Sequence, residues 1–456
     1  MRQLAETQKW MVLSKIFVGI PVSIAYILRN FSAATTMTLT EYLASPSPAW
    51  AAENASTLLK SFGFEEATHA HDGVSNKLFA RPFSGMLLAA HRPQKIDPAQ
   101  LQLRIIGAHT DSPHLRLKSN SAAVKEGHTL LTSEVYGGAL LYTWFDRPLG
   151  LAGEIFYKEN NTIQRKLIRI QEPIAVVPSL AIHLARGVND DGFKIEKTQN
   201  LHALLSLTED ISLDAYLASV ADIPTDALLS YDLSLFDTTP ATQGGLNNEL
   251  LMSARLDNLV SAHSAITALK KADSPNIIAI AALFDHEEIG SVSEAGAESV
   301  QLEKFLRRIQ NHLKITDTQW EGVLQRSLFL SADMAHGVHP NYADKSDTEN
   351  RPRLGGGVTL KMNQNRRYAT SAAGAAFFHD LCRTHKIPSQ VYTHRNDLPC
   401  GSTLGPAVSA RLGMTTIDVG VAMLAMHSIR EICAIEDLES YRRFMEFFMA
   451  KPLEFF

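Results

Sequence analysis

The feature that most constrains this chain is a continuous apolar run that ends in a cluster of acidic residues. Residues 276–283 (NIIAIAAL) follow a proline and have the pattern of a strand buried on both faces of a sheet. The run leads directly into residues 284–291 (FDHEEIGS). Adjacent carboxylates at the end of a buried strand repel each other, and they stay ionised only beside a cation. A metal site, with one glutamate as ligand and its neighbour as general base, is the simplest explanation, and a solvated acidic turn is the alternative.

Length and composition predict a globular protein of two domains. A chain of 456 residues is too long for one ordinary core. Its formal net charge of −5 gives no reason to expect nucleic acid or an anionic membrane as a partner. The three cysteines include no CxxC pair, which fits a reducing, cytoplasmic compartment and argues against a zinc site made of thiolates.

Residues 1–36 differ in character from the rest of the chain. Residues 10–28 are mostly apolar with basic residues around them, which is typical of a signal peptide or a membrane anchor. The alternative is a translated upstream extension, because Met37 precedes a segment suited to the first helix of a cytoplasmic enzyme. We favour the extension and do not expect attachment to a membrane.

The order of predicted elements indicates an α/β fold with an insertion. Helix and strand patterns alternate in residues 37–120 and again in residues 244–456, as in an α/β sandwich. Between residues 121 and 243, strand-like runs alternate with turns, and no helical period is sustained until about residue 198. We therefore expect a discontinuous main domain (37–120 and 244–456) that is interrupted by a mostly β domain (121–243).

Side chains suited to metal ions lie at or shortly after the ends of predicted strands, or at the start of a helix. They are His109, Asp257, Glu287, Glu288, Asp333 and His427. In open α/β sheets, ligands bind beyond the carboxyl ends of the strands. Two histidines and three carboxylates, with one glutamate left free, suit a pair of zinc ions that share a carboxylate and a water. Asp111 follows His109 by two residues and is placed to orient that imidazole.

A series of short motifs runs from about residue 38 to the C-terminus. They are residues 107–113 (GAHTDSP), 142–147 (YTWFDR), 180–184 (LAIHL), 255–258 (RLDN), 285–291 (DHEEIGS), 333–336 (DMAH), 339–342 (HPNY), 396–403 (NDLPCGST) and 425–431 (AMHSIRE). In this combination the chain resembles the aspartyl aminopeptidases, the M18 family of dinuclear zinc metallopeptidases. Residues 1–36 lie outside the resemblance.

The resemblance implies two zinc ions in each subunit, for which Mn²⁺ or Co²⁺ can substitute. His109 and Asp333 would hold one ion, and Glu288 and His427 would hold the other. Asp257 would bridge the two. This assignment of ligands to two ions uses the same two histidines and three carboxylates that were identified above from residue type and position.

The resemblance also implies a reaction. Glu287 would be the general base that takes a proton from the zinc-bound water, while Asp111 would orient His109. The water would attack the first peptide bond of peptides with a free N-terminus, preferably those that begin with Asp or Glu. A related dinuclear aminopeptidase of neutral or broad specificity, and a catalytically silent assembly subunit, are the alternatives.

Substrate binding and assembly are implied in the same way. His183 matches a histidine that a neighbouring subunit places in the active site, and Lys361 and Tyr368 match positions that contact substrate. A lysine there would pair with an acidic side chain, although a lone lysine would ordinarily be interpreted as a surface residue. The family folds as a three-layer α/β/α metallopeptidase domain with an inserted, mostly β assembly domain, and it forms dodecamers, so we expect a homo-oligomer.

Overall fold

The computed structural model describes residues 37–67 and 75–452, and the features below belong to the unit that spans residues 39–456. Both interpretations of residues 1–36 therefore lie outside the described residues. Within the described ranges, none of the helices combines the length and the apolar composition that crossing a bilayer requires.

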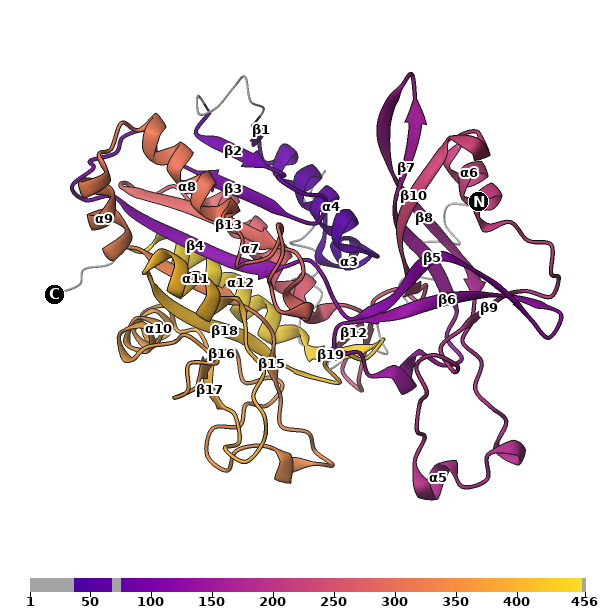
Figure 1. Cartoon of the computed structure of the whole chain (residues 1–456). Coiled ribbons are helices and arrows are strands. Elements are labelled where there is room, and N and C mark those ends of the chain that lie inside the picture. The colour runs from indigo at the N-terminus through magenta and orange to yellow at the C-terminus, as the bar shows by residue number, and fades with distance from the viewer. Residues whose placement is uncertain (1–36, 68–74, 453–456) are drawn as a thin grey trace, which may run out of the picture. The chain divides into compact units, whose positions relative to one another are not determined.

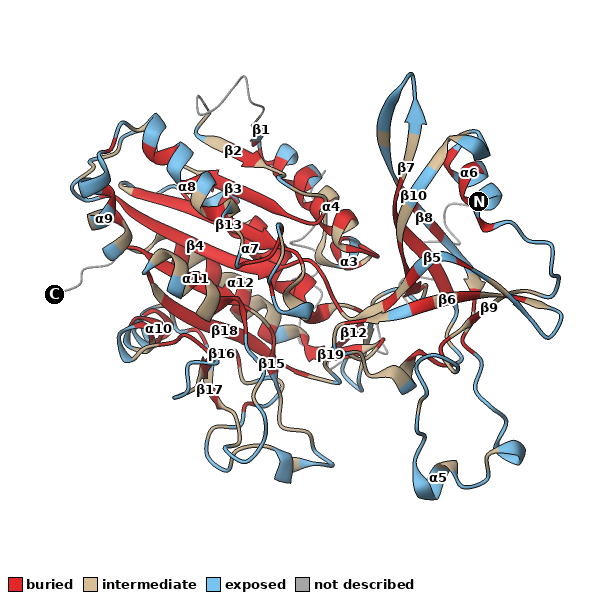
Figure 2. Cartoon of the chain, in the orientation of Figure 1, coloured by how far each residue is buried: buried red, intermediate tan, exposed pale blue. Residues whose placement is uncertain are grey.

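The larger of two sheets has thirteen strands. They are β1 (Glu65–Glu66), β2 (Lys77–Ala80), β3 (Leu87–His91), β4 (Gln102–His109), β11 (Thr242–Gly244), β12 (Leu250–Ser253), β13 (Ile277–Phe284), β14 (Leu328–Ala332), β15 (Ala335–His336), β16 (Val358–Met362), β17 (Ser389–Thr393), β18 (Thr415–Leu424) and β19 (Glu431–Ala434). Strands β13, β4, β14 and β18 are neighbours in this order and run parallel (Figure 1). Every residue of β13 is buried, which confirms the strand predicted from the apolar run (Figure 2).

Helices cover both faces of this sheet, so the domain has three layers. They are α3 (Leu39–Leu43), α4 (Pro48–Ser61), α7 (Leu256–Lys271), α8 (Gln301–His312), α9 (Asp317–Gln325), α10 (Ala372–His385), α11 (Leu404–Leu412) and α12 (Ile435–Ala450). Phe305 of α8, Trp320 of α9 and Leu404 of α11 share one core with alternate residues of the central strands. Side chains of the other alternate set face α7, α10 and α12, and Arg104 of β4 donates a hydrogen bond to the carbonyl of Lys451 beyond α12.

The second sheet has six strands, and every pairing in it is antiparallel. They are β5 (His114–Lys125), β6 (His128–Tyr136), β7 (Leu149–Glu159), β8 (Thr162–Ala175), β9 (Ala203–Ser206) and β10 (Leu228–Asp237). This sheet has its own apolar core, to which α6 (Leu213–Ala221) contributes Leu213 and Leu217. The short helix α5 (Val188–Asp191) lies in an exposed connection between β8 and β9.

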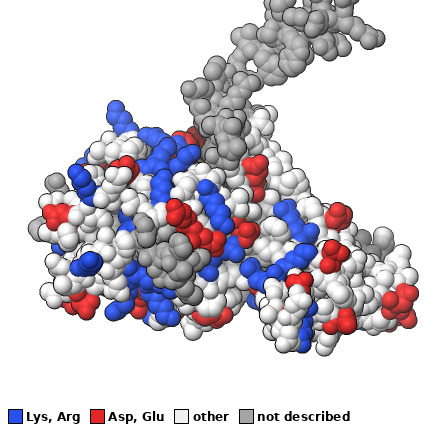
Figure 3. All heavy atoms as spheres, turned by 90° about the horizontal axis from the view of Figure 1, so that it is seen from above, with Lys and Arg blue, Asp and Glu red and all other residues white. Residues whose placement is uncertain are grey.

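Five short 3₁₀ helices complete the described elements: η1 (Leu141–Trp144), η2 (Ile182–Leu184), η3 (Thr225–Ala227), η4 (Glu287–Ile289) and η5 (Ala343–Lys345). The architecture is the predicted α/β/α domain with a mostly β insertion, although the limits of 121 and 243 for that insertion stay a prediction. Figure 3 shows acidic and basic side chains intermingled on one face of the molecule.

Candidate metal centre

The predicted ligands meet because parallel strands end at the same edge of a sheet. His109 is the last residue of β4, Glu288 follows β13 within η4, and Asp333 directly follows β14. His427 comes three residues after the end of β18. Asp257 joins them from the first turn of α7, where its φ and ψ angles are not helical. One edge of the sheet therefore collects side chains that are up to 318 positions apart in the sequence, from His109 to His427.

The two oxygens of Asp257 face two different imidazoles. Asp257 Oδ1 lies 3.5 Å from His109 Nε2, and Asp257 Oδ2 lies 3.5 Å from His427 Nε2. Asp333 Oδ1 is 3.5 Å from His109 Nε2, while Glu288 Oε1 is 3.3 Å from His427 Nε2. We call the first group the His109 half-site (His109, Asp333 and Asp257) and the second the His427 half-site (His427, Glu288 and Asp257).

This arrangement fits divalent metal ions. Ligand atoms of His109, Asp257 and Glu288 all lie within 4.8 Å of one another. Two buried carboxylate oxygens, Asp257 Oδ1 and Glu288 Oε1, have no hydrogen-bond partner among the described residues. Leaving such atoms unsatisfied is costly, whereas a cation between the half-sites would satisfy both. Imidazole nitrogen and carboxylate oxygen are ordinary ligands of zinc.

The site also has the electrostatics of a cation site. Burial favours the neutral form of Asp257, but His109 and His427 hold the pKa of its carboxyl well below the usual range. Burial lowers the pKa of His427, yet the facing carboxylates of Asp257 and Glu288 raise it to about 11. The pKa of His109 is also raised well above its ordinary value, because Asp111, Asp257 and Asp333 outweigh its burial. The imidazoles therefore hold protons that bound metal ions would displace.

Glu287 stands beside the half-sites at a greater distance. Its Oε2 lies 4.0 Å from His109 Nε2, which is farther than the 3.5 Å of Asp257 and Asp333. Burial raises the pKa of Glu287 well above its ordinary value, and the neighbouring charges of Asp333 and Glu288 act in the same direction. A carboxylate with a raised pKa next to a metal site has the properties of a general base.

Asp111 and Glu431 accept hydrogen bonds from the backbone of the proposed ligands and of Glu287. Asp111 Oδ1 lies 3.3 Å from His109 Nδ1, and the Asp111 carboxylate accepts the N–H groups of Glu287 at 3.2 Å and Glu288 at 3.0 Å. Glu431 accepts the N–H groups of Asp257 at 3.0 Å and His427 at 2.7 Å. The sequence analysis assigned no role to Glu431, although it is an acidic residue four positions after His427 in the same motif.

A cavity of about 440 Å³ opens onto these residues. Every residue of the two half-sites except His109 lines it, together with Glu287, Lys361, Tyr368 and His336. Lys361 is only 2% exposed, so it is not a surface lysine. Its Nζ lies 3.0 Å from Asp333 Oδ2 and 3.0 Å from the carbonyl of Met334, and 5.2 Å from the centre of the Tyr368 ring. A cavity of this size accommodates a small ligand.

His183 is placed differently from the other predicted site residues. It lies in η2 on an exposed segment and is not among the described residues that line the cavity. Its neighbours Leu180, Ile182 and Leu184 are 61%, 46% and 75% exposed. Within one chain, the fold does not bring His183 to the metal centre.

Comparisons with known proteins agree on one family. Residues 43–449 match the model of the family described as aminopeptidase I zinc metalloprotease (M18). The probable M18 family aminopeptidase 2 of Pseudomonas aeruginosa (strain UCBPP-PA14) is 39% identical over 406 residues, which cover 87% of this chain and 93% of that protein. A related protein of Pseudomonas putida (strain F1) with the same description is 40% identical over 410 residues, which cover 88% of this chain and 94% of that one.

Solved structures give the same result. The chain in the cryo-EM structure of the Ape4 and Nbr1 complex superposes with a TM-score of 0.85 at 33% identity, covering 90% of this chain and 84% of that one. The S. cerevisiae mApe1 dodecamer gives a TM-score of 0.78 at 26% identity, covering 90% of this chain and 95% of that one. With the family model matched over most of its length, this chain belongs to the M18 family of zinc metalloprotease aminopeptidases.

Proposed function

We propose that this protein is a dinuclear zinc aminopeptidase that removes N-terminal residues, preferably Asp or Glu, from peptides. The observation that carries the proposal is the placement of Asp257, whose two oxygens each lie 3.5 Å from a different imidazole. A carboxylate between two nitrogen ligands is suited to bridging a pair of ions. The His109 half-site would hold one zinc ion and the His427 half-site the other.

The residues of the centre divide the chemistry between them. Bound zinc ions would supply Lewis acidity to a water and to the scissile carbonyl. Glu287, whose Oε2 lies 4.0 Å from His109 Nε2, would accept a proton from that water without being consumed as a ligand, and it would return the proton to the leaving amine. Asp111 keeps His109 Nε2 directed at the half-site, because its backbone carbonyl accepts from His109 Nδ1 at 3.0 Å and its carboxylate lies 3.3 Å from the same nitrogen.

The acidic preference rests on Lys361. An ammonium group has three N–H donors, and two of them are directed to Asp333 and to the carbonyl of Met334. The third remains for a carboxylate of the substrate in the cavity that Lys361 and Tyr368 line. The same pairing with Asp333 supports a second candidate, an aminopeptidase of broad specificity in which Lys361 serves only to neutralise the metal centre.

Assembly is part of the proposal. We assign residues 37–120 and 244–456 to the peptidase domain and residues 121–243 to an assembly domain of a homo-oligomer, a dodecamer like the one named for the S. cerevisiae relative. The exposed Leu180, Ile182 and Leu184 would be covered by a neighbouring subunit, which would receive His183 in its active site. The sparse cysteines favour a cytoplasmic location.

A panel of aminoacyl-4-nitroanilides, with metal analysis of the same samples, tests the proposal. We expect two zinc ions per subunit, hydrolysis that chelation abolishes and zinc restores, and a higher kcat/KM for Asp and Glu than for Leu and Ala. Full activity in metal-stripped protein would contradict a metal mechanism. Equal kcat/KM for Asp and Leu substrates would favour the broad-specificity candidate instead.

A further inference from the structure

One connection of the six-stranded sheet lies against both half-sites. Residues 136–140, which we call the β6 connection, leave the end of β6 and lead to η1. Tyr136, the last residue of β6, is 7% exposed. The connection belongs to the part of the chain that we assign to assembly, yet it contacts Asp111, which supports His109, and the proposed ligand His427.

At the His109 half-site, the contact is made by the Tyr136 hydroxyl. It donates a hydrogen bond of 2.7 Å to Asp111 Oδ2. The same carboxylate faces His109 Nδ1 and accepts the backbone N–H groups of Glu287 and Glu288. The hydrogen bond from Tyr136 to Oδ2 limits rotation of the Asp111 carboxylate. Tyr136 therefore helps to fix the positions of the ligand His109 and of the general base Glu287.

At the His427 half-site, the contacts are made by the backbone. The carbonyl of Gly138 accepts from His427 Nδ1 at 3.2 Å, and the N–H of Leu140 donates to the carbonyl of His427 at 2.9 Å. Binding at Nδ1 leaves His427 Nε2 directed at Asp257 and Glu288. A methyl group on Gly138 would lie 3.3 Å from His427 Nδ1, so the imidazole would have to shift by a few tenths of an ångström to accommodate it.

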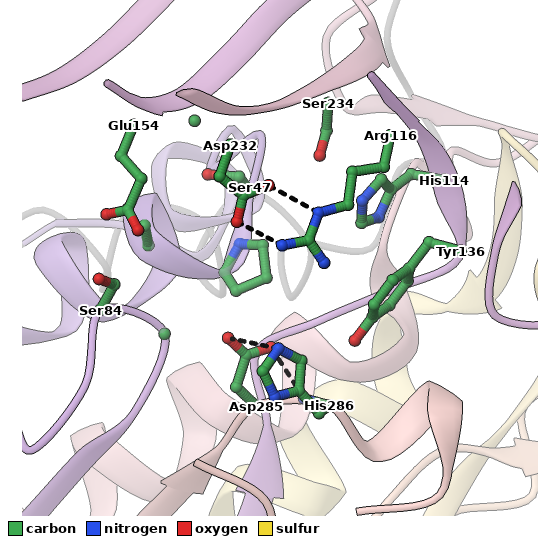
Figure 4. A pocket seen from close by; sticks show the side chains of 14 residues that line it. Ser47, Ser84, His114, Arg116, Tyr136, Glu154, Asp232, Ser234, Asp285 and His286 are labelled. Carbon is green, nitrogen blue, oxygen red and sulfur yellow. Dashed lines mark hydrogen bonds and ion pairs between the residues drawn. The ribbon is translucent and has the colours of Figure 1, made fainter. Parts of the chain in front are cut away.

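Tyr136 is held in place by its ring as well as by its hydroxyl. Figure 4 shows the ring beside His114 and Arg116, across a polar cavity from Asp285 and His286. The ring stacks on the His114 imidazole at 4.6 Å, and the Arg116 guanidinium lies 5.8 Å from its centre. Phenylalanine would keep these ring contacts, so Tyr136→Phe removes one hydroxyl donor and little else.

We propose that the β6 connection is a positioning element of the metal centre, with the Tyr136 hydroxyl acting through Asp111 and the Gly138 carbonyl acting on His427. The six-stranded sheet then helps to set the geometry of the reaction as well as the assembly of subunits. Tyr136 touches neither substrate nor metal, so it is a positioning residue. The inference rests on the proposed function, because it presupposes that ions bind at the half-sites.

Binding of cobalt(II) alone, followed by absorption spectroscopy of the purified full-length protein, tests the inference without relying on turnover. We expect Tyr136→Phe to bind cobalt more weakly by about tenfold, the lower end of the effect of losing an outer partner, and to change the cobalt spectrum. With saturating zinc, kcat should fall while KM stays within about twofold, because substrate contacts are intact.

Tyr231→Phe is the matched control. Tyr231 lies in β10 of the same sheet, and its hydroxyl contacts Ser121 and the carbonyl of Lys118. Tyr231→Phe also loses one phenolic hydroxyl, but that hydroxyl does not contact the metal centre. We therefore expect this variant to have the same cobalt affinity, cobalt spectrum and kcat as the unchanged protein. Tyr136→Phe behaving like Tyr231→Phe would overturn the inference.

Gly138→Ala probes the same connection from the other half-site and decides the matter if Tyr136→Phe does not fold, as judged by circular dichroism. We expect it to weaken one of two cobalt sites, seen as a biphasic titration. Unchanged cobalt binding by Gly138→Ala would overturn the inference at that half-site. Failure of the unchanged protein to bind cobalt would instead overturn the proposed function, and the inference with it.

Discussion

Replacing Glu287 by glutamine separates the general base from the metal ligands. The substitution keeps the shape of the side chain but removes its ability to accept a proton. Glu287 Oε2 lies 4.0 Å from His109 Nε2, whereas the nearest oxygens of Asp257 and Asp333 lie 3.5 Å from it, so we expect the half-sites to retain their ions. Loss of a general base typically lowers kcat by about 10²- to 10⁴-fold, which corresponds to roughly 3–5 kcal/mol in the barrier.

The local charges predict the effect on stability. Burial and the carboxylates of Asp333 and Glu288 raise the pKa of Glu287, which means that its ionised form is unfavourable in the metal-free protein. A neutral glutamine avoids that repulsion, so metal-free Glu287→Gln should unfold at a temperature no lower than the metal-free parent. A large fall in the unfolding temperature would show that Glu287 supports the fold. The change in kcat could then not be assigned to loss of the base alone.

The assay is steady-state hydrolysis of an acidic aminoacyl-4-nitroanilide, with zinc content measured on the same protein. Glu298→Gln is the matched control, because Glu298 is an exposed acid that lines the same cavity, and its kcat should stay within about threefold of the parent. A Glu287→Gln variant with full zinc content and near-parental kcat would refute the reasoning and move the role of base to another residue.

Three further predictions concern the ions, the specificity and the assembly. Asp257→Asn should reduce the zinc content below two per subunit and lower kcat/KM by at least about 100-fold, since the carboxylate that the half-sites share loses one of its two oxygens; zinc analysis showing two tightly held ions would contradict this. Lys361→Met should lower kcat/KM for Asp and Glu substrates by about 30- to 1000-fold relative to Leu substrates, and an equal change for all substrates would mean that Lys361 only neutralises Asp333. Co-expression of His183→Phe with Glu287→Gln should restore activity in verified mixed oligomers, and no recovery there would argue that His183 does not act across a subunit boundary.

The site could be predicted to the extent that it follows from strand order. Glu288, Asp333 and His109 each stand at the end of an apolar run, and parallel neighbours bring such ends to one edge. Asp257 does not follow a strand; it was predicted as a carboxylate at the start of a helix, and its bridging role came from the resemblance. Where each ligand side chain points depends on contacts between distant segments, which no local pattern contains.

Burial of polar residues was the least predictable property. Lys361 lies on β16, which is paired with β17 and β18, and this packing turns an ordinary-looking lysine into a buried partner of Asp333. Glu431 and Tyr136 make their contacts with residues that are distant in the sequence or in another sheet. A propensity or a periodicity describes neighbours within one element, so these three roles required the fold.

Two helices in the C-terminal part of the chain differ in how clearly the sequence alone indicates them. α11 begins with Leu404, Gly405 and Pro406, and glycine and proline at a helix start weaken the helical pattern even though proline is tolerated in the first turn. α12 has a regular spacing of apolar residues, including the buried Tyr441, Phe444, Met445 and Phe448. Its period was therefore readable, and the helix could have been predicted from residues 435–450 alone.

The charge of the buried centre favours two ions over one. Five carboxylates surround it, and one buried ammonium, that of Lys361, lies among them. The carboxylates are those of Asp111, Asp257, Glu287, Glu288 and Asp333. Burial and the charge of Asp257 raise the pKa of nearby Glu431 to about 8, so it is largely neutral at pH 7. Bound cations would favour the ionised form of Glu287, whose pKa is raised in their absence. With all five of these carboxylates ionised and neutral imidazoles as ligands, four negative charges remain, which two divalent ions would neutralise. One ion would leave two of these charges buried without compensation, which is costly in an interior shielded from water.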